Sequence, residues 1–423
     1  MLEIRGACLP DGTRQNVFIA DGKIREVSSL HRADYQVIRA EGLDIFPGII
    51  DPHVHGRTPG HPDKENWHCL TRAALSGGVT TVFDMPNTNP PLTTFAGIDE
   101  KIAIIGDHKV GKFFWFGATP ENGNEILQSR KHPGIIGVKV YMARTTGNLL
   151  VANDRDIESI FRMAASVDLV VGVHAEDEDL ITRNSDLMRR PSIVADHCRL
   201  RDTETEVRAV ARALRICRDT GGRLYLCHIS TPEAVRLAAE EKARGLPVAV
   251  EVCPHHISLS AERLSQGDGG FYKMNPPLRT FRQMDDLRKY LCAEDGPIDC
   301  VGSDHAPHTW HEKTSERYED IPSGVPGVET LGPLLYHFVA TGQMSRKRFT
   351  NITSRNAAQI FELPQKGRIE AGADADLILC KSQGNTHFDH TKMHSLCGWT
   401  PYHGTQIRGE IQIVIKKGEI VKF

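Results

Sequence analysis

The sequence lacks several features that would mark whole classes of protein. No apolar run approaches the roughly 20 residues of a membrane helix, and Met1–Gly6 has neither the basic nor the apolar region of a signal peptide. Lysine and arginine number 51 against 54 aspartates and glutamates, a formal net charge of −3. The chain therefore has no basic excess for nucleic acid and no acidic tail. We expect a cytoplasmic protein with no membrane partner and no nucleic-acid partner.

Paired cysteines of the CxxC type are also missing, and so are repeats and low-complexity segments. The ten cysteines are scattered, a pattern typical of reduced thiols rather than of a disulfide framework. We expect most of them to be core side chains. A chain of 423 residues can bury a large core, and one (β/α)8 barrel absorbs about 250 residues.

Short β-rich runs alternate with helical stretches through the middle of the chain. Eight such runs occur, at residues 45–51, 80–84, 113–117, 135–141, 169–174, 224–228, 248–253 and 299–303. Between them, amphipathic patterns of ordinary helix length occur at residues 154–165, 204–219 and 232–244. Eight parallel strands with right-handed crossovers predict an α/β fold, a (β/α)8 TIM barrel with its chemistry at the C-terminal strand ends.

The two ends of the chain have a different pattern. Residues 1–45 form short strand-like runs with turns at Asp11-Gly12 and Asp21-Gly22, and the last 55 or so residues return to that style. We expect residues 46–365 to form the metal-dependent barrel. Residues 1–45 and 366–423 are expected to pair as a small β-sandwich beside it.

Side chains that bind metals recur at the ends of the predicted barrel strands. They are His53, His55, Lys139, His174, His228 and Asp304. The first two stand one residue apart after a strand, so both can face one ion. A single histidine at a strand end is more often structural than metal-ligating. The barrel, however, gathers all six positions at one mouth, which favours a metal centre.

Lys139 stands between Val138 and Val140 in a strand that should be buried. A buried charged amine is costly, so it must be paired, neutralised or modified. One interpretation is a buried ion pair. The other is carbamylation by carbon dioxide, which makes a carboxylate able to bridge two metal ions. With four histidines and Asp304, that bridge predicts a binuclear centre, and nitrogen and oxygen ligands favour zinc.

Several motifs carry a resemblance that spans nearly the whole chain. Residues 46–51 read FPGIID, residues 366–369 read KGRI, and residues 372–377 read GADADL. The chain resembles the amidohydrolase superfamily and, within it, the dihydroorotase family of the lysine-bridged kind. Hydantoinases and allantoinases share the metal set. Hydantoinases, however, usually place a tyrosine just after the lysine strand, where this chain reads Met142-Ala143-Arg144.

The resemblance implies a reaction and a mechanism. The reaction is the reversible, zinc-dependent cyclisation of N-carbamoyl-L-aspartate to (S)-dihydroorotate in de novo pyrimidine biosynthesis. Two zinc ions bridged by carboxylated Lys139 would share a hydroxide that attacks the ring carbonyl. Asp304 would accept its proton and deliver it to the departing ring nitrogen. Ring closure requires Asp304 protonated, so low pH should favour it.

Substrate selection should come from groups that recognise a carboxylate. The planar fork of Arg57 suits a carboxylate, and the family has this arginine in its HxHxR pattern. The resemblance also assigns carboxylate contacts to Asn87 and His308, a ring contact to Asn275, and backbone contacts to the loop with Pro326 and Gly327. Alternatives remain: a surface ion pair of Arg57 with Asp63 or Glu65, and a turn or capping role for the two asparagines.

Several further histidines stand outside this ligand set. No metal role is assigned to His255 or His256, because the ligand set is complete without them, and His305 is expected to be structural. His61 and His68 lie in a loop where the family tends to be acidic, and an additional metal contact there stays an open alternative. Another cyclic-amide hydrolase, a hydantoinase (dihydropyrimidinase) or an allantoinase, is the alternative function. A non-catalytic scaffold homologue would be expected to lose ligands. We expect a homo-oligomer, a dimer or tetramer, with aspartate transcarbamoylase as a candidate protein partner.

Overall fold

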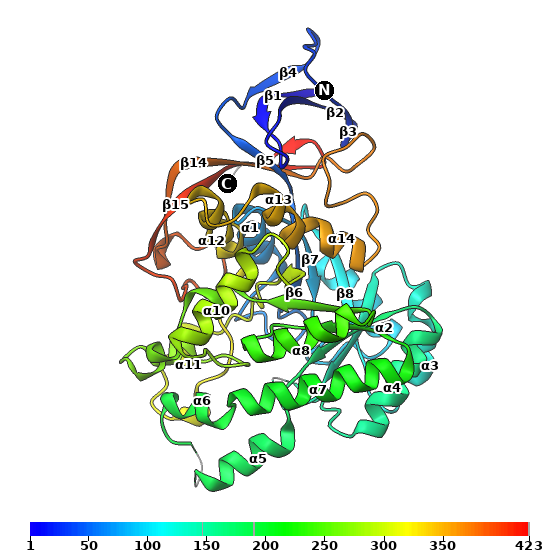
Figure 1. Cartoon of the computed structure of the whole chain (residues 1–423), viewed down its shortest axis with the longest axis vertical. Helices are drawn as coiled ribbons and strands as arrows, with labels where there is room; N and C mark the ends of the chain where they lie inside the picture. Colours follow the sequence, from blue (N-terminus) through cyan, green and yellow to red (C-terminus); the bar gives the residue numbers. More distant parts are fainter. Residues whose placement is uncertain (146, 189–190, 422–423) are drawn as a thin grey trace.

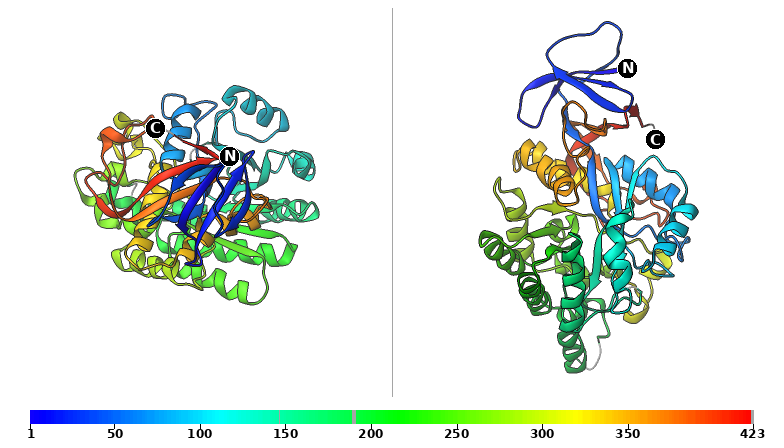
Figure 2. Two further views of the ribbon diagram at one scale, coloured as in Figure 1. Left: turned by 90° about the horizontal axis from the view of Figure 1, so that it is seen from above. Right: turned by 90° about the vertical axis from the view of Figure 1, so that its right-hand side faces the viewer.

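The computed structural model describes residues 1–145, 147–188 and 191–421. It has two parts, a large barrel and a smaller sheet that projects from one end of it (Figure 1). Both ends of the chain lie in or beside the smaller sheet, as the two further views also show (Figure 2). In the part of the chain that is described, no helix is long and apolar enough to cross a membrane. All ten cysteines are free thiols, which confirms the prediction.

The larger part is an eight-stranded parallel sheet whose strands are paired in chain order. The strands are β6 Ile49–Val54, β7 Val79–Asp84, β8 Gly111–Gly117, β9 Ile135–Tyr141, β10 Val170–His174, β11 Arg223–Leu226, β12 Val248–Val252 and β13 Cys300–Val301. A parallel bridge between Val54 and His305 joins the first strand to the segment after the last. The predicted (β/α)8 barrel is confirmed.

Helices follow the barrel strands, and the longer ones pack against their outer face. They are α1 Trp67–Ser76, α2 Phe95–Ile105, α3 Gly123–Gln128, α4 Asp154–Ser166, α5 Glu178–Leu187, α6 His197–Leu200, α7 Thr203–Thr220, α8 Pro232–Ala243, α9 Pro254–Ser258, α10 Phe281–Cys292, α11 Trp310–Lys313, α12 Val328–Ala340, α13 Arg346–Thr350 and α14 Asn356–Ile360. The three helices predicted from amphipathic patterns correspond to α4, α7 and α8. Side-chain caps start them, such as Asn153 for α4 and Asp202 for α7.

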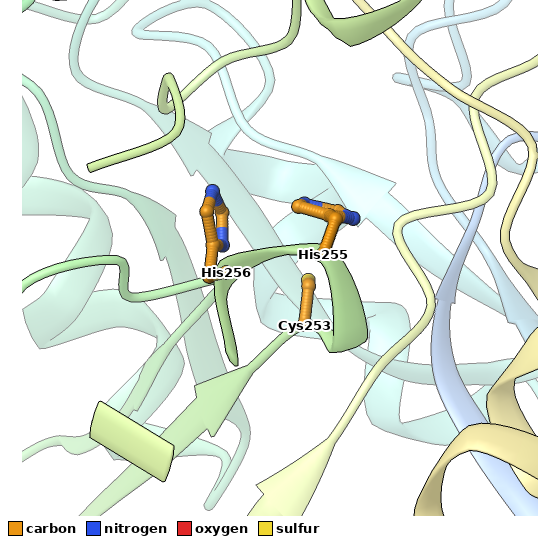
Figure 3. A group of neighbouring side chains, drawn as sticks. All are labelled: Cys253, His255 and His256. Atoms are coloured by element: carbon orange, nitrogen blue, oxygen red, sulfur yellow. The ribbon is translucent and has the colours of Figure 1, made fainter. Parts of the chain in front are cut away.

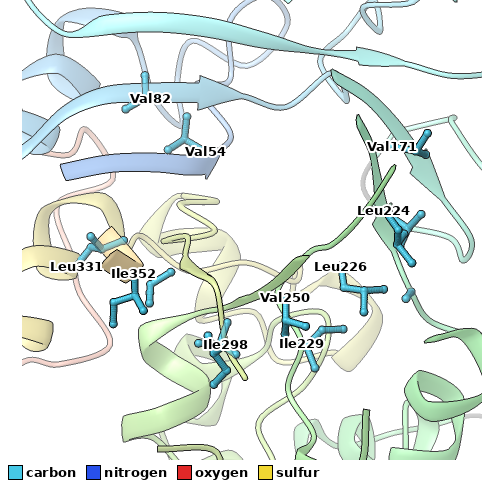
Figure 4. Close-up of a cluster of buried hydrophobic side chains, with 14 of the residues drawn as sticks. Val54, Val82, Val171, Leu224, Leu226, Ile229, Val250, Ile298, Leu331 and Ile352 are labelled. Atoms are coloured by element: carbon cyan, nitrogen blue, oxygen red, sulfur yellow. The ribbon is translucent and has the colours of Figure 1, made fainter. Parts of the chain in front are cut away.

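Two apolar layers hold the barrel together. The larger lies between strands and helices and includes Val54, Val171, Leu226 and Val250 (Figure 4). The other contains side chains such as Phe83, Trp115 and Tyr225, which belong to different strands of the barrel. Because strand side chains alternate, the flanking residues of Lys139, Val138 and Val140, belong to the first layer and Lys139 faces inward.

The smaller part is one mixed sheet built from both terminal segments. Its order is β16-β15-β14-β5-β1-β2-β3, with β4 also paired to β1. The strands are β1 Leu2–Cys8, β2 Arg14–Ala20, β3 Lys23–Ser28, β4 Gln36–Arg39, β5 Asp44–Pro47, β14 Leu377–His387, β15 Gln406–Lys416 and β16 Glu419–Ile420. The sequence predicts a small β-sandwich built from both ends of the chain; the strands of both ends do come together, and they are paired in this single sheet.

The two parts are joined through Gly48, between β5 and β6. A Cβ atom at this position would lie 2.3 Å from Oγ1 of Thr80, so the close passage of the two segments admits only glycine. β5 pairs with β14 of the C-terminal segment, with Leu377 opposite Pro47. The first barrel strand, which leads to His53, is therefore anchored at its start in the mixed sheet.

Candidate functional site

Four histidines and Asp304 meet at the C-terminal ends of the barrel strands. Nε2 of His55 lies 3.0 Å from Oδ1 of Asp304, and Nε2 of His53 lies 3.4 Å from the same oxygen. Nδ1 of His174 lies 3.0 Å from Nε2 of His228. All five residues line one cavity. The structure thus brings together the five residues that the strand-end argument grouped with Lys139.

Outer hydrogen bonds orient the first two imidazoles. Nδ1 of His53 donates to Glu251 at 2.9 Å, and Nδ1 of His55 donates to Asn87 at 2.8 Å. A histidine that donates through one nitrogen presents a lone pair on the other, which is the arrangement of metal-binding histidines. With these tautomers, the Nε2 lone pairs of both rings face Oδ1 of Asp304, where a bound metal ion would meet all three side chains.

Burial sets the protonation of these groups. It lowers the pKa of His53, His174 and His228 below the usual value, so the rings are neutral and able to bind a cation. For Asp304, burial alone would raise the pKa. The neighbouring side chains of His53 and His55 outweigh it and lower the pKa to about 2. The site combines neutral nitrogen donors with a carboxylate.

Lys139 lies on β9 and is fully buried, with an exposed fraction of 0%. Its Nζ lies 2.8 Å from Sγ of Cys227 and 5.2 Å from the centre of the Tyr141 ring. Among the described residues, none places a carboxylate within salt-bridge distance of this amine. Lys139 therefore forms no ion pair with the described residues, and its amine is available for modification.

The donor set fits metal ions. Ligand atoms of His53, His55 and Asp304 all lie within 4.8 Å of one another. The facing nitrogens of His174 and His228 form a second set of neutral donors. Nitrogen and oxygen donors of this kind are those that zinc prefers. Metal ions would be held by these side chains at the barrel mouth.

Three residues of the site have an unusual backbone. Arg57, His228 and Asp304 have φ values of +57°, +38° and +44°. Non-glycine residues rarely adopt this left-handed region, and such strain is concentrated at functional sites. The simple alternation of a strand does not extend to Arg57, because β6 ends at Val54. The turn after the strand brings its side chain to the cavity instead.

Arg57 is a buried cation rather than a surface group. Its exposed fraction is 4%, and burial lowers its pKa to about 10. Nε donates to the carbonyl of Pro307 at 3.1 Å, and Nη2 lies 3.1 Å from Nε2 of His308. Among the described residues, Arg57 forms no ion pair. The alternative of a surface pair with Asp63 or Glu65 does not hold, since Glu65 instead contacts His305 and Ser395.

Of the other residues predicted to contact the substrate, two line the cavity and one contacts Arg57 instead. Asn87 and Asn275 line the cavity with Arg57. His308 lies behind Arg57, where its Nε2 also contacts the carbonyl of Ser323 at 3.1 Å.

Pro326 and Gly327 do not line this cavity. They border a separate small cavity, and the Gly327 amide donates to Nδ1 of His305 at 3.1 Å. Ser323 and Gly324 are the residues of that loop that line the site. His305 is buried and held by Glu65 as well, in keeping with the structural role expected for it.

Sequence reasoning missed several residues of the cavity wall, among them Tyr141, Thr145, Ala306, Ser323 and Gly324. The Tyr141 hydroxyl is buried and has no hydrogen-bond partner in the described part of the chain. Strand periodicity could have found it, because Tyr141 is two residues after Lys139 on β9 and so shares its face. Ser323 and Gly324 begin the glycine-rich loop that the resemblance places at the ring, but the contacts were assigned to Pro326 and Gly327 of that loop.

Comparison with known proteins places this site in a family. Residues 45–421 match the amidohydrolase family model. A protein from Halobacterium salinarum called dihydroorotase is 37% identical over 96% of this chain and 92% of its own length. A Deinococcus radiodurans protein called allantoinase is 34% identical over 99% and 95%. The solved L-hydantoinase (dihydropyrimidinase) of Arthrobacter aurescens has a TM-score of 0.94 and 28% identity, covering 99% of this chain and 95% of that one.

The chain belongs to the amidohydrolase family. Within that family it is a dihydroorotase-like member of the group of cyclic amidohydrolases that also contains allantoinases and hydantoinases. The compared proteins have the same fold and belong to the same class of hydrolases, but their names give different substrates. The residues of this site must therefore be used to infer which cyclic substrate the protein binds.

Proposed function

We propose that the protein is a dihydroorotase, which interconverts N-carbamoyl-L-aspartate and (S)-dihydroorotate in pyrimidine biosynthesis. The observation that carries the proposal is Arg57, a buried guanidinium at the cavity with no carboxylate of the described chain to pair with. A buried charge without a counter-ion is costly. A substrate that brings its own carboxylate supplies the missing anion. Dihydroorotate has one, whereas hydantoin and allantoin have none.

The proposal includes two zinc ions and a carbamylated Lys139. The lysine is buried among the metal-ligand candidates and has no ion-pair partner in the described part of the chain, and addition of carbon dioxide would turn it into an anionic ligand. His53, His55 and Asp304 would hold one part of the centre, and His174 and His228 the other. When bound, such ions polarise a carbonyl and lower the pKa of water toward neutrality.

The chain's own residues then have distinct tasks in ring opening. Asp304 accepts the proton of the attacking water and returns it to the ring nitrogen that departs. Arg57 and Asn87 bind the carboxylate, with His308 behind the guanidinium, so that the ring carbonyl starts beside the nucleophile. Asn275, Ser323 and Gly324 contact the ring from the other wall. Ring closure follows the same path in reverse.

A substrate panel tests this function. The zinc-loaded protein is assayed with dihydroorotate, dihydrouracil, hydantoin and allantoin, and kcat/KM is compared. Dihydroorotate should exceed each uncharged ring by about a hundredfold or more, since two charge-assisted hydrogen bonds are worth roughly 3 kcal/mol or more. A preference for allantoin or hydantoin would instead assign the protein to one of those sister activities. No turnover of any ring in protein that binds metal would support a scaffold role.

A further inference from the structure

A second cluster of metal-binding side chains lies outside the cavity. Cys253 directly follows β12, and His255 and His256 are in the first turn of the short helix α9 (Figure 3). Ligand atoms of the three residues lie within 4.8 Å of one another, and all three side chains are buried. None of them lines the cavity that contains Arg57 and Asp304. The sequence argument assigned these histidines no role because the catalytic ligand set was already complete.

The hydrogen bonds of His256 show which of its nitrogens is free. Nε2 lies 3.0 Å from the carbonyl of Pro276, to which it must donate, because a carbonyl oxygen can only accept. Nδ1 of the same ring then presents a lone pair. This atom is buried and has no hydrogen-bond partner among the described residues. An outer carbonyl that fixes the tautomer of a histidine is a regular feature of metal sites.

His255 also has a buried nitrogen without a partner among the described residues, and Cys253 lies close to it. Nε2 of His255 is buried and accepts or donates no hydrogen bond in the described part of the chain. The rings of His255 and His256 lie with their centres 4.3 Å apart, edge to face. Cys253 is fully buried. An unsatisfied buried polar group costs about 1–3 kcal/mol of stability. One ligand bound by the two unpartnered imidazole nitrogens and the thiol would remove this cost.

We propose that Cys253, His255 and His256 bind one further divalent ion of the zinc class, as a structural site distinct from the catalytic centre. One thiolate with two neutral imidazoles suits zinc, and a water molecule would complete the tetrahedron. Burial lowers the pKa of both histidines, which keeps them in the neutral form that binds a cation. The thiol proton would be released when the ion binds.

The site would have a mechanical consequence for substrate binding. His256 contacts Pro276, and the preceding residue, Asn275, lines the catalytic cavity. Asn275 is also held by Nε2 of His197, 2.8 Å from its side-chain oxygen. An ion on His256 would fix the ring that holds the Pro276 carbonyl. The proposed ion is therefore expected to stiffen the wall of the cavity without touching substrate.

Cobalt substitution tests the proposal, because a cysteine ligand produces a near-ultraviolet sulfur-to-cobalt absorption band that nitrogen and oxygen ligands do not. The protein is stripped of metal, loaded with Co²⁺, and compared as wild type, Cys227→Ser and Cys253→Ser. Cys227 is the matched control because it lies next to Lys139 in the catalytic centre. We expect the band in wild type and Cys227→Ser. We expect its loss in Cys253→Ser, with about one ion fewer per chain, since one set of ligands holds one ion.

Absence of the band from wild type, or its persistence in Cys253→Ser, would overturn the second site. If Cys253→Ser does not fold, zinc-edge X-ray absorption of Cys227→Ser protein replaces it. A sulfur neighbour of zinc in that protein supports the proposal, and its absence refutes it. Turnover of dihydroorotate is measured on the same samples. A wild-type protein that turns over dihydroorotate but has no sulfur signal would refute this site alone, so its failure is distinguishable from failure of the proposed function.

Discussion

Arg57, His228 and Asp304 each combine burial with a left-handed backbone conformation. A non-glycine residue in this region costs on the order of 1–3 kcal/mol, and a charged group inside the protein adds to that cost. Three such residues around one cavity indicate that the geometry is maintained for binding rather than for stability. The place of the candidate ligands and of Arg57 could be predicted because they lie at or follow the ends of predicted strands. Their backbone conformation could not, because nothing in a residue type specifies it.

At Asp304, replacement by asparagine tests its role as a proton carrier. The amide keeps the size and one oxygen of the carboxylate but cannot accept a proton. We expect Asp304→Asn to retain its fold and bound metal while kcat falls by about a hundredfold or more, the range typical of a lost general acid–base group. Metal content by mass spectrometry and kcat for dihydroorotate are measured together. Near-normal turnover in a metal-loaded variant would leave Asp304 as a ligand only.

Among the elements, α11 and two loops form one unit around the substrate site. Lys313, the last residue of α11, is buried, and its Nζ donates to the carbonyls of Lys273, Pro322 and Gly324 at 3.0, 2.9 and 3.0 Å. The Gly324 amide in turn donates to the carbonyl of Lys273 at 2.9 Å. One side chain therefore ties the segment before Asn275 to the loop that lines the cavity.

Removal of this tie should affect both stability and substrate binding. In Lys313→Met, three carbonyls lose a donor, and we expect the free energy of unfolding to fall by about 2 kcal/mol or more. KM for dihydroorotate should rise several-fold while the metal content stays normal. Lys289→Met is the control, since Lys289 is a surface residue of α10 paired with Asp285 and Asp286 and should lose less than about 1 kcal/mol. Equal effects in the two variants would contradict the role of Lys313.

The bounds of two barrel strands show how far the sequence pattern could predict the elements of secondary structure. Residues 135–141 were predicted as a strand and form β9 with the same limits, because an uninterrupted apolar run surrounds Lys139. The last strand was expected over residues 299–303, yet β13 covers only Cys300–Val301. After Val301 the chain turns to place Asp304 at the cavity, and His305 then bridges to Val54 of the first strand. The loop that begins at Ser323 was expected at the site from the resemblance, but a loop has no periodicity, so which of its residues line the cavity could not be predicted.

On the scale of the whole molecule, the candidate ligands come from or follow β6, β9, β10, β11 and β13. Ions bound there would tie together strands from around the whole barrel. The alternation of strands and helices was enough to predict the barrel. The pairing of β5 with β14 could not be predicted in register, because it joins segments more than 300 residues apart.

Metal removal should therefore lower the stability of the whole barrel. An ion present at a thousandfold excess over its dissociation constant stabilises the folded state by about 4 kcal/mol. We expect a chelator to lower Tm by several degrees while far-ultraviolet circular dichroism at room temperature stays the same. Added zinc should restore Tm. If Tm is insensitive to both chelator and zinc, the gathered histidines do not hold metal.

The central claim is that a buried arginine selects a ring with a carboxylate. It is tested most directly by comparing Arg57→Met with wild type on dihydroorotate and on dihydrouracil, which has the ring but no carboxylate. We expect kcat/KM for dihydroorotate to fall by about tenfold or more, because charged hydrogen bonds are worth roughly 1.5 to 3 kcal/mol each. The slow hydrolysis of dihydrouracil should barely change. Metal loss or unfolding would lower both rates alike, so equal losses would mean that Arg57 supports the structure and does not select the substrate.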